Sequence, residues 1–279
     1  MMDKTLIAFS FDDGRLDNYT NAYPILKKEG LPATFNITTG YIKGNIDREQ
    51  FDFPEPMNQE MVQEIYKDGR YEIAGHGNQH INTVEDIVSG IKELCELLQT
   101  ERLSKNSNGF ASPGSDLTET MYKEMKPILD ANHISYIRIS CRYNSLAFLK
   151  ILARKISRFV KLPWLYKIAY KDSLMEEADN DIMYSVPVLS SVTFNQLKAV
   201  VAQAIKEKKV FVLMFHSIVP GDSIRNTWDY PKEKFEKFCF FLSEMQKKGE
   251  LEVVTTMNAY LSLKRGGNLR HTDPTDLPD

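Results

Sequence analysis

Cysteine is scarce in this sequence of 279 residues, and the three cysteines that occur form no motif. Cys95, Cys141 and Cys239 are odd in number and widely spaced, so they predict neither a disulfide framework nor a cysteine-rich zinc site. We interpret them as core thiols, which are typical of a protein kept in a reducing compartment.

Excess charge and long apolar runs are also missing. Lys and Arg number 35 against 38 Asp and Glu, and the net charge of -3 gives no reason to expect nucleic acid as a partner. No apolar run approaches the roughly 20 residues of a membrane span. The first residues lead directly into a strand pattern, without the basic, apolar and small-residue regions of a secretory signal. We therefore expect a cytoplasmic protein, or a secreted one if a leader has been removed.

The sequence does contain a long alternation of strand-like and helix-like segments. Apolar, β-rich runs occur at 5–11, 32–38, 71–76, 109–113, 135–140, 182–189, 209–218 and 251–256. Runs with helical spacing lie between them, at 19–30, 58–69, 83–102, 194–208 and 231–249. About seven or eight such units predict parallel strands with helical crossovers and favour a closed barrel over an open sheet. We expect one domain over residues 1–264 and a disordered tail over 265–279.

A long segment at about 145–181 interrupts this alternation. It carries an apolar stripe, made of Leu149, Leu152, Ile156 and Phe159, and a basic stripe, made of Lys150, Arg154, Arg158 and Lys161. Such a helix is typical of a membrane surface, or of a helix that covers the barrel mouth and turns its basic face to solvent. We favour the second interpretation. Trp164 is then more readily a buried anchor than a platform for a sugar.

Two adjacent carboxylates, Asp12 and Asp13, follow the first predicted strand and precede Gly14. Neighbouring like charges raise each other's pKa, so the pair needs a neutralising partner or has a chemical role. His76 and His80 follow the third predicted strand, and on a helical turn their spacing would bring both imidazoles to one face. Strand ends that lead into helices carry the active sites of parallel barrels, so one Asp and both His predict an open, three-ligand metal site.

A further histidine, His216, follows the apolar run at 209–215. At the end of a strand, a histidine can act as a general acid near neutral pH. The alternative is a core histidine that is hydrogen-bonded to the backbone, and without the other motifs we would favour it.

Together these segments resemble the polysaccharide deacetylase family, the carbohydrate esterase family 4 type that shares the NodB homology domain. The matching motifs are SFDDG at 10–14, HGNQH at 76–80 and MFH at 214–216, with Gly77 in the place of a usual Ser or Thr. The resemblance runs from about Lys4 to Tyr260, apart from the insert. It implies an α/β fold, a distorted (β/α)7–8 barrel with the helical insert after the fifth strand.

Two other motifs of the family are altered. Where the third motif has Arg-x-Pro-aromatic, the sequence has FASPGS, so Ala111 replaces the arginine and Gly114 the aromatic residue. The Asp and Trp of the fourth motif are missing near the strand at 135–140. Arg138 in that strand is a candidate to supply the missing guanidinium from a neighbouring strand, and a surface arginine is an equal alternative.

The resemblance implies a metal-dependent deacetylase. Asp13, His76 and His80 would bind one divalent metal, for which zinc is the first expectation and cobalt, iron or manganese also suit the ligands. Asp12 would act as the base and His216 as the acid, and the backbone N–H of Gly114 would stabilise the oxyanion. The expected substrate is an N- or O-acetylated carbohydrate. The alternatives are a hydrolase of a non-sugar amide or formyl group, and a silent member that binds metal or glycan.

Overall fold

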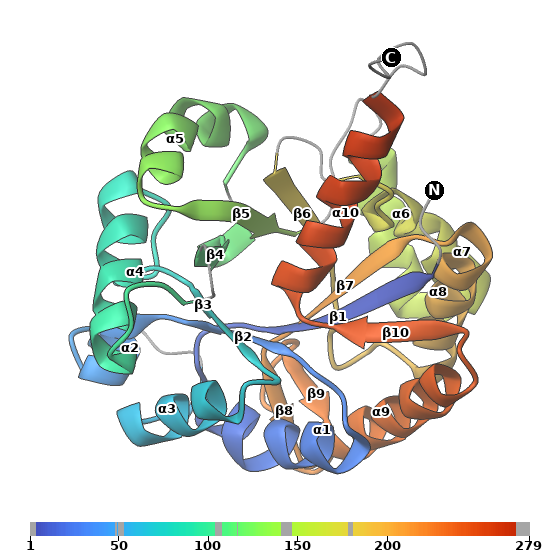
Figure 1. Ribbon diagram of the computed structural model, residues 1–279. Coiled ribbons are helices and arrows are strands. Elements are labelled where there is room, and N and C mark those ends of the chain that lie inside the picture. The colour runs from blue at the N-terminus through green and yellow to red at the C-terminus, as the bar shows by residue number, and fades with distance from the viewer. Residues whose placement is uncertain are drawn as a thin grey trace, which may run out of the picture.

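Parallel strands close a barrel in the part of the chain that the computed structural model describes, residues 4–47, 49, 53–103, 108–115, 117–140, 147–177 and 181–271 (Figure 1). In order around the barrel they are β1 (Thr5–Phe11), β2 (Thr34–Ile37), β3 (Glu72–Gly75), β4 (Asn108–Ala111), β5 (Ile134–Ile139), β6 (Ile182–Pro187) and β7 (Val210–Phe215), and β7 pairs with β1. β10 (Leu251–Val254) pairs with the first half of β1, whereas β2 pairs with its last residues. The predicted barrel is therefore confirmed.

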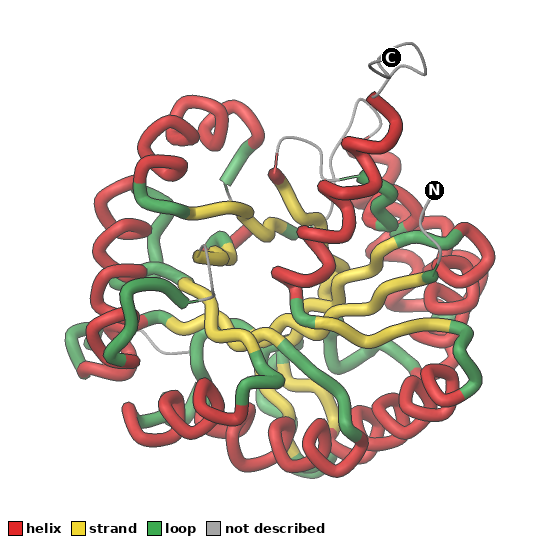
Figure 2. Tube along the Cα trace, viewed as in Figure 1, coloured by secondary structure: helices red, strands yellow, loops and turns green. Residues whose placement is uncertain are grey.

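Helices surround this barrel on the outside, except α10 (Thr256–His271), which crosses one end of the barrel (Figure 2). The surrounding helices are α1 (Tyr23–Glu29), α2 (Thr39–Lys43), α3 (Gln59–Asp68), α4 (Val84–Leu98), α5 (Glu119–Ala131), α8 (Phe194–Glu207) and α9 (Lys232–Lys247), with shorter turns η1 (Asn18–Ala22), η3 (Pro113–Ser115) and η4 (Lys171–Ser173). A small parallel pair, β8 (Ser217–Val219) and β9 (Asp229–Pro231), follows β7. The sequence patterns did not predict α2, α5, α10 or β9.

Local sequence explains why these elements form and face inward. Every residue of β1 is buried, because helices cover the outer face of a parallel barrel and side chains fill its interior. α4 begins at Thr83, whose side chain accepts the N–H of Asp86. The apolar side chains of α4 with helical spacing, which are Ile87, Ile91, Leu94 and Leu98, are buried against the barrel. The carboxyl ends of all these strands therefore meet at one rim, and this rim positions the candidate site.

The insert after β5 is helical, as expected, and contains α6 (Ala147–Val160) and α7 (Pro163–Ala169). Its expected orientation is wrong, because the apolar stripe from Leu149 to Phe159 faces solvent while Arg154 is buried. Trp164 is also exposed, so it is not a buried anchor. Residues 145–146 and 178–180 of the insert lie outside the described residues.

Several other expectations concern the thiols, the C-terminal region and membrane spans. Cys95 and Cys239 are free and buried, as predicted, and Cys141 lies outside the described residues. α10 continues through His271, beyond the boundary at residue 265, and residues 272–279 lie outside the described part. Among the described helices, none is long and apolar enough to cross a membrane.

Candidate metal and catalytic site

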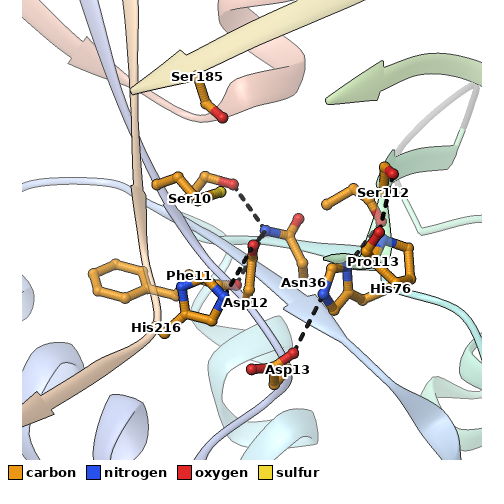
Figure 3. Close-up of polar contacts among 12 residues, drawn as sticks. Ser10, Phe11, Asp12, Asp13, Asn36, His76, Ser112, Pro113, Ser185 and His216 are labelled. Carbon is orange, nitrogen blue, oxygen red and sulfur yellow. Dashed lines mark hydrogen bonds and ion pairs between the residues drawn. The ribbon is translucent and has the colours of Figure 1, made fainter. Parts of the chain in front are cut away.

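The end of β1 separates the two adjacent carboxylates. Asp12 still belongs to the sheet, because its N–H donates to the Phe215 carbonyl oxygen of β7 at 2.9 Å. The backbone then turns through two left-handed residues, Asp13 with φ 75° and Gly14 with φ 76°. A left-handed aspartate is uncommon, and such strained positions gather at functional sites. The turn sends the two carboxylates to different partners at the rim (Figure 3).

Asp13 lies between a buried arginine and two histidines. Its Oδ2 accepts hydrogen bonds from Arg15, at 2.8 Å from Nε and 2.7 Å from Nη2. Its Oδ1 lies 3.3 Å from Nε2 of His76 and 3.2 Å from Nε2 of His80. Burial would raise the pKa of Asp13, but Arg15 and the two imidazoles outweigh it and hold this pKa well below its usual range. Asp13 is therefore ionised at neutral pH.

The two histidines lie on a loop, so the expected helical turn is wrong. The loop is ordered by Asp86, whose carboxylate accepts the backbone N–H groups of Asn78, Gln79 and Ile81. Gly77 has φ 82°, and a Cβ there would lie 2.4 Å from Asp86 Oδ2, which explains why a hydroxyl residue does not fit at this position.

The donor set fits a metal ion. Nδ1 of His76 donates to the Ala111 carbonyl oxygen at 2.8 Å, which leaves a lone pair on Nε2, directed at Asp13. Asp13 Oδ1 is buried and has no hydrogen-bond partner among the described residues. One ligand atom each from Asp13, His76 and His80 lies within 4.8 Å of the others. A carboxylate oxygen and imidazole lone pairs at these distances repel unless a proton or a cation lies between them.

Asp12 is held by a different cation. Its Oδ1 accepts a hydrogen bond from Arg138 Nη2 and another from Asn36 Nδ2, the latter at 2.8 Å. Arg138 lies on β5 in register with Ala111, and its side chain is 1% exposed. The surface alternative is therefore wrong, because Arg138 reaches the site from the strand next to the altered third motif. Burial would raise the pKa of Asp12, but Arg138 and the nearby imidazoles lower it below the ordinary value.

His216 lies directly after β7, on the other side of Asp12. Its Nε2 is 3.9 Å from Asp12 Oδ2, and Trp228 packs on the imidazole with a ring-centroid distance of 4.3 Å. Nδ1 of His216 has no hydrogen-bond partner within the described chain, so the alternative of a histidine tied to the backbone through this nitrogen does not hold. Burial lowers the pKa of His216 to about 4, so the imidazole is neutral at neutral pH.

Gly114, the candidate oxyanion donor, lies three residues beyond Ala111 in the turn that follows β4 and has φ 59°. It is exposed at the same rim as the candidate metal ligands. The sequence motifs did not point to Arg15, Asn36 or Trp228, which also lie at this site. A polar residue within the apolar strand at 32–38 was the available signal for Asn36, and the charge next to the paired carboxylates was the signal for Arg15.

Comparisons with known proteins agree with the motifs. The family described as polysaccharide deacetylase matches residues 1–128. Poly-beta-1,6-N-acetyl-D-glucosamine N-deacetylase of Staphylococcus aureus (strain MRSA252) is 31% identical over 103 residues, which are 37% of this chain and 34% of that protein. The chain therefore matches only about a third of the length of this curated relative.

Two solved structures are also similar. The Bc1960 peptidoglycan N-acetylglucosamine deacetylase has a TM-score of 0.50 and 15% identity, over 94% of this chain and 90% of that chain. IcaB from Ammonifex degensii has a TM-score of 0.37 and 23% identity, over 47% of this chain and 57% of that chain. At these identities the first likeness concerns the fold alone.

Proposed function

We propose that this chain, whose residues 1–128 belong to the polysaccharide deacetylase family, is a metal-dependent hydrolase that removes an N- or O-acetyl group from a carbohydrate. One observation carries the proposal. The buried Asp13 Oδ1, which has no hydrogen-bond partner among the described residues, faces the Nε2 atoms of His76 and His80. A second carboxylate, Asp12, lies beside it with its own arginine. A divalent cation held by Asp13, His76 and His80 would satisfy all three ligand atoms. Zinc suits this set best.

A bound divalent cation would polarise the acetyl carbonyl and lower the pKa of a water molecule. The protein's own residues prepare for that chemistry. Arg15 fixes Asp13 through its Nε and Nη2, which both contact Oδ2, and leaves Oδ1 for the ligand role. The Ala111 carbonyl fixes the ring of His76 and its tautomer, which is the usual way in which a metal-binding histidine is oriented.

Asp12 is the proposed general base. Arg138 and Asn36 occupy Oδ1, which orients the carboxylate and keeps it ionised, while Oδ2 faces His216. Oδ2 is therefore the oxygen placed to accept a proton from the attacking water. Because Arg138 lowers the pKa of Asp12, the base remains available at mildly acidic pH.

His216 is the proposed acid. With its pKa lowered to about 4, the resting imidazole is neutral and donates only after it has received a proton. Asp12, whose Oδ2 lies 3.9 Å from Nε2, is the nearest carboxylate that acquires one during the reaction. His216 then protonates the departing amine or alkoxide, while the N–H of Gly114 stabilises the oxyanion. All these groups lie on one barrel, so we also propose that a single domain over residues 1–264 carries the activity.

Acetate release and metal content test this function together. The purified protein is stripped of metal, reloaded with zinc, cobalt, iron or manganese, and assayed on chito-oligosaccharides, acetylated xylan and a simple acetamide. Acetate from either carbohydrate that depends on metal supports the proposal. Release from the amide alone indicates the small-amide alternative, and metal binding with no release indicates a silent protein.

Matched aspartate variants then separate the two carboxylates. Asp13→Asn should lose metal and activity together. Asp12→Asn should keep metal near the normal content and lower the rate by roughly a hundred-fold or more, which is the usual scale for a lost general base. If Asp12→Asn loses metal and Asp13→Asn retains it, the roles are exchanged. If neither variant loses activity, the proposed function is wrong.

A further inference from the structure

The helical insert exposes a surface that the proposed chemistry does not use. We define the insert face as the exposed apolar side chains between residues 149 and 168, which are Leu149, Ile151, Leu152, Ile156, Phe159, Val160, Leu162, Trp164 and Ile168. Phe159 is 88% exposed and Trp164 is 56% exposed. Single exposed apolar residues are ordinary, but a group of this size on one small element marks an interaction site.

The folded structure holds this face outward. α6 packs through its polar side, where Arg154 is 4% exposed and its Nε donates to the Ala169 carbonyl of α7 at 3.1 Å. Ser157 on the same side is fully buried, and its carbonyl accepts a hydrogen bond from Gln196 of α8 at 2.7 Å. These directional hydrogen bonds therefore fix the orientation of α6 about its axis. The helix cannot rotate to bury its apolar residues without breaking these hydrogen bonds.

The charged residues of α6 and α7 are all of one sign. The sequence contains no Asp or Glu between Asp130 and Asp172, although the chain as a whole has a net charge of -3. Lys155 and Lys161 are exposed on α6 and directly after it, and Lys167 lies on α7. Local positive charge beside Trp, Phe and Leu is the composition of helices that lie in the interface of anionic membranes.

The insert is attached at the barrel mouth. The Tyr166 hydroxyl of α7 contacts the carbonyl oxygen of Pro187, the last residue of β6, at 3.4 Å. α6 and α7 lie on the outside of the barrel beside α8 (Figure 1). A surface that binds the insert face would therefore lie near the rim formed by the carboxyl ends of the strands.

We propose that the insert face docks on an anionic phospholipid surface. Its apolar side chains enter the boundary between headgroups and acyl chains, and Lys155 and Lys161 contact lipid phosphates. The barrel remains outside the bilayer, because the described helices include none that could span it. This proposal uses no residue of the candidate active site.

Vesicle flotation of the full chain tests the docking. Vesicles of phosphatidylcholine alone are compared with vesicles that contain about 30% phosphatidylglycerol. We expect binding at least about ten-fold stronger to the anionic vesicles and a large loss in high salt, because each basic residue near the surface contributes roughly five-fold. Phe159→Ser combined with Trp164→Ser should lower this binding at least about ten-fold. Phe240→Ser, at a residue of α9 that is also 56% exposed, is the control and should bind normally.

Fluorescence gives a local readout. The chain has two tryptophans, so Trp228→Phe leaves Trp164 as the single reporter, and its emission should shift to shorter wavelength on anionic vesicles only. The proposal is overturned if anionic vesicles fail to bind the chain, or if the Phe159 and Trp164 variant binds as well as the control. A dimer in solution that the same variant abolishes also overturns it, because a second copy of the chain is then the partner. Acetate release from a soluble oligosaccharide should be unchanged in the variant with Phe159→Ser and Trp164→Ser. The membrane proposal and the proposed function can therefore fail independently of each other.

Discussion

Replacing Arg138 by methionine removes the cation that faces Asp12 inside the barrel. Both side chains are almost fully buried, at 1% and 3% exposed, and Asn36 is the other donor to the same carboxylate oxygen. Removal of one partner of a buried ion pair costs about 3–5 kcal/mol, because the remaining charge stays in a medium of low dielectric. We expect Arg138→Met to lower the free energy of unfolding by this amount at neutral pH. Arg138→Lys, which keeps the charge but loses the planar fork, should lose less.

The pH dependence of this loss has a definite sign. In the unaltered protein the pKa of Asp12 lies below its unfolded value, so its stabilising contribution is present above that value and is lost as the pH falls. Without Arg138, burial dominates and the pKa of Asp12 rises above the unfolded value. The stability deficit of Arg138→Met should therefore be small at pH 4 and should grow as the pH rises toward 7.

Urea denaturation of the metal-free proteins from pH 4 to 8 measures this deficit, and a double-mutant cycle isolates the pair. Asp12→Asn combined with Arg138→Met should recover a large part of the loss, because no buried charge is then left alone. The prediction is refuted if Arg138→Met lowers the free energy of unfolding by less than about 1 kcal/mol. It is also refuted if the loss in the double variant equals the sum of the losses in the two single variants.

Three further predictions follow from single residues. His216→Ala should reduce hydrolysis of an acetamide much more than that of an activated aryl acetate, since a good leaving group needs little protonation; equal losses would contradict the acid role. Gly77→Ala should weaken metal binding at least about ten-fold in a titration, because its Cβ would lie 2.4 Å from Asp86 Oδ2; unchanged affinity would show that the loop does not position His80. Burial raises the pKa of Asp17 to about 6, so its charged form destabilises the folded state as the pH rises through 6. Relative to Asp17→Asn, the protein should therefore lose up to about 3 kcal/mol of unfolding free energy between pH 4 and 7, and parallel stability curves would refute this.

Local sequence patterns account for the barrel and for the candidate metal ligands. Strand-like runs such as 5–11 and 210–215 are apolar at nearly every position, because both faces of a parallel barrel strand are covered, so composition alone reveals them. Asp13, His76 and His80 each follow such a run, and strand ends meet at one rim in any parallel barrel. This is why a one-dimensional pattern predicted residues that are near neighbours in space.

Contacts between side chains of different strands could be identified only from the tertiary structure. The pairing of Arg138 with Asp12 requires the register that places Arg138 opposite Ala111, and a shift of one residue would turn the guanidinium to the other face. Trp228 reaches His216 only through the chain that follows β8, which no periodicity indicates.

The orientation of the insert shows the same limit. Amphipathic spacing correctly predicted a helix with two faces, but spacing cannot tell which face packs. The hydrogen bonds of Arg154 and Ser157 to α7 and α8 decided it, since buried polar groups that find partners can outweigh the exposure of apolar ones. The sequence by itself determined the barrel, the candidate metal ligands and the existence of the insert. Only the packing of distant segments determined which cations neutralise the two carboxylates and which side of the insert meets solvent.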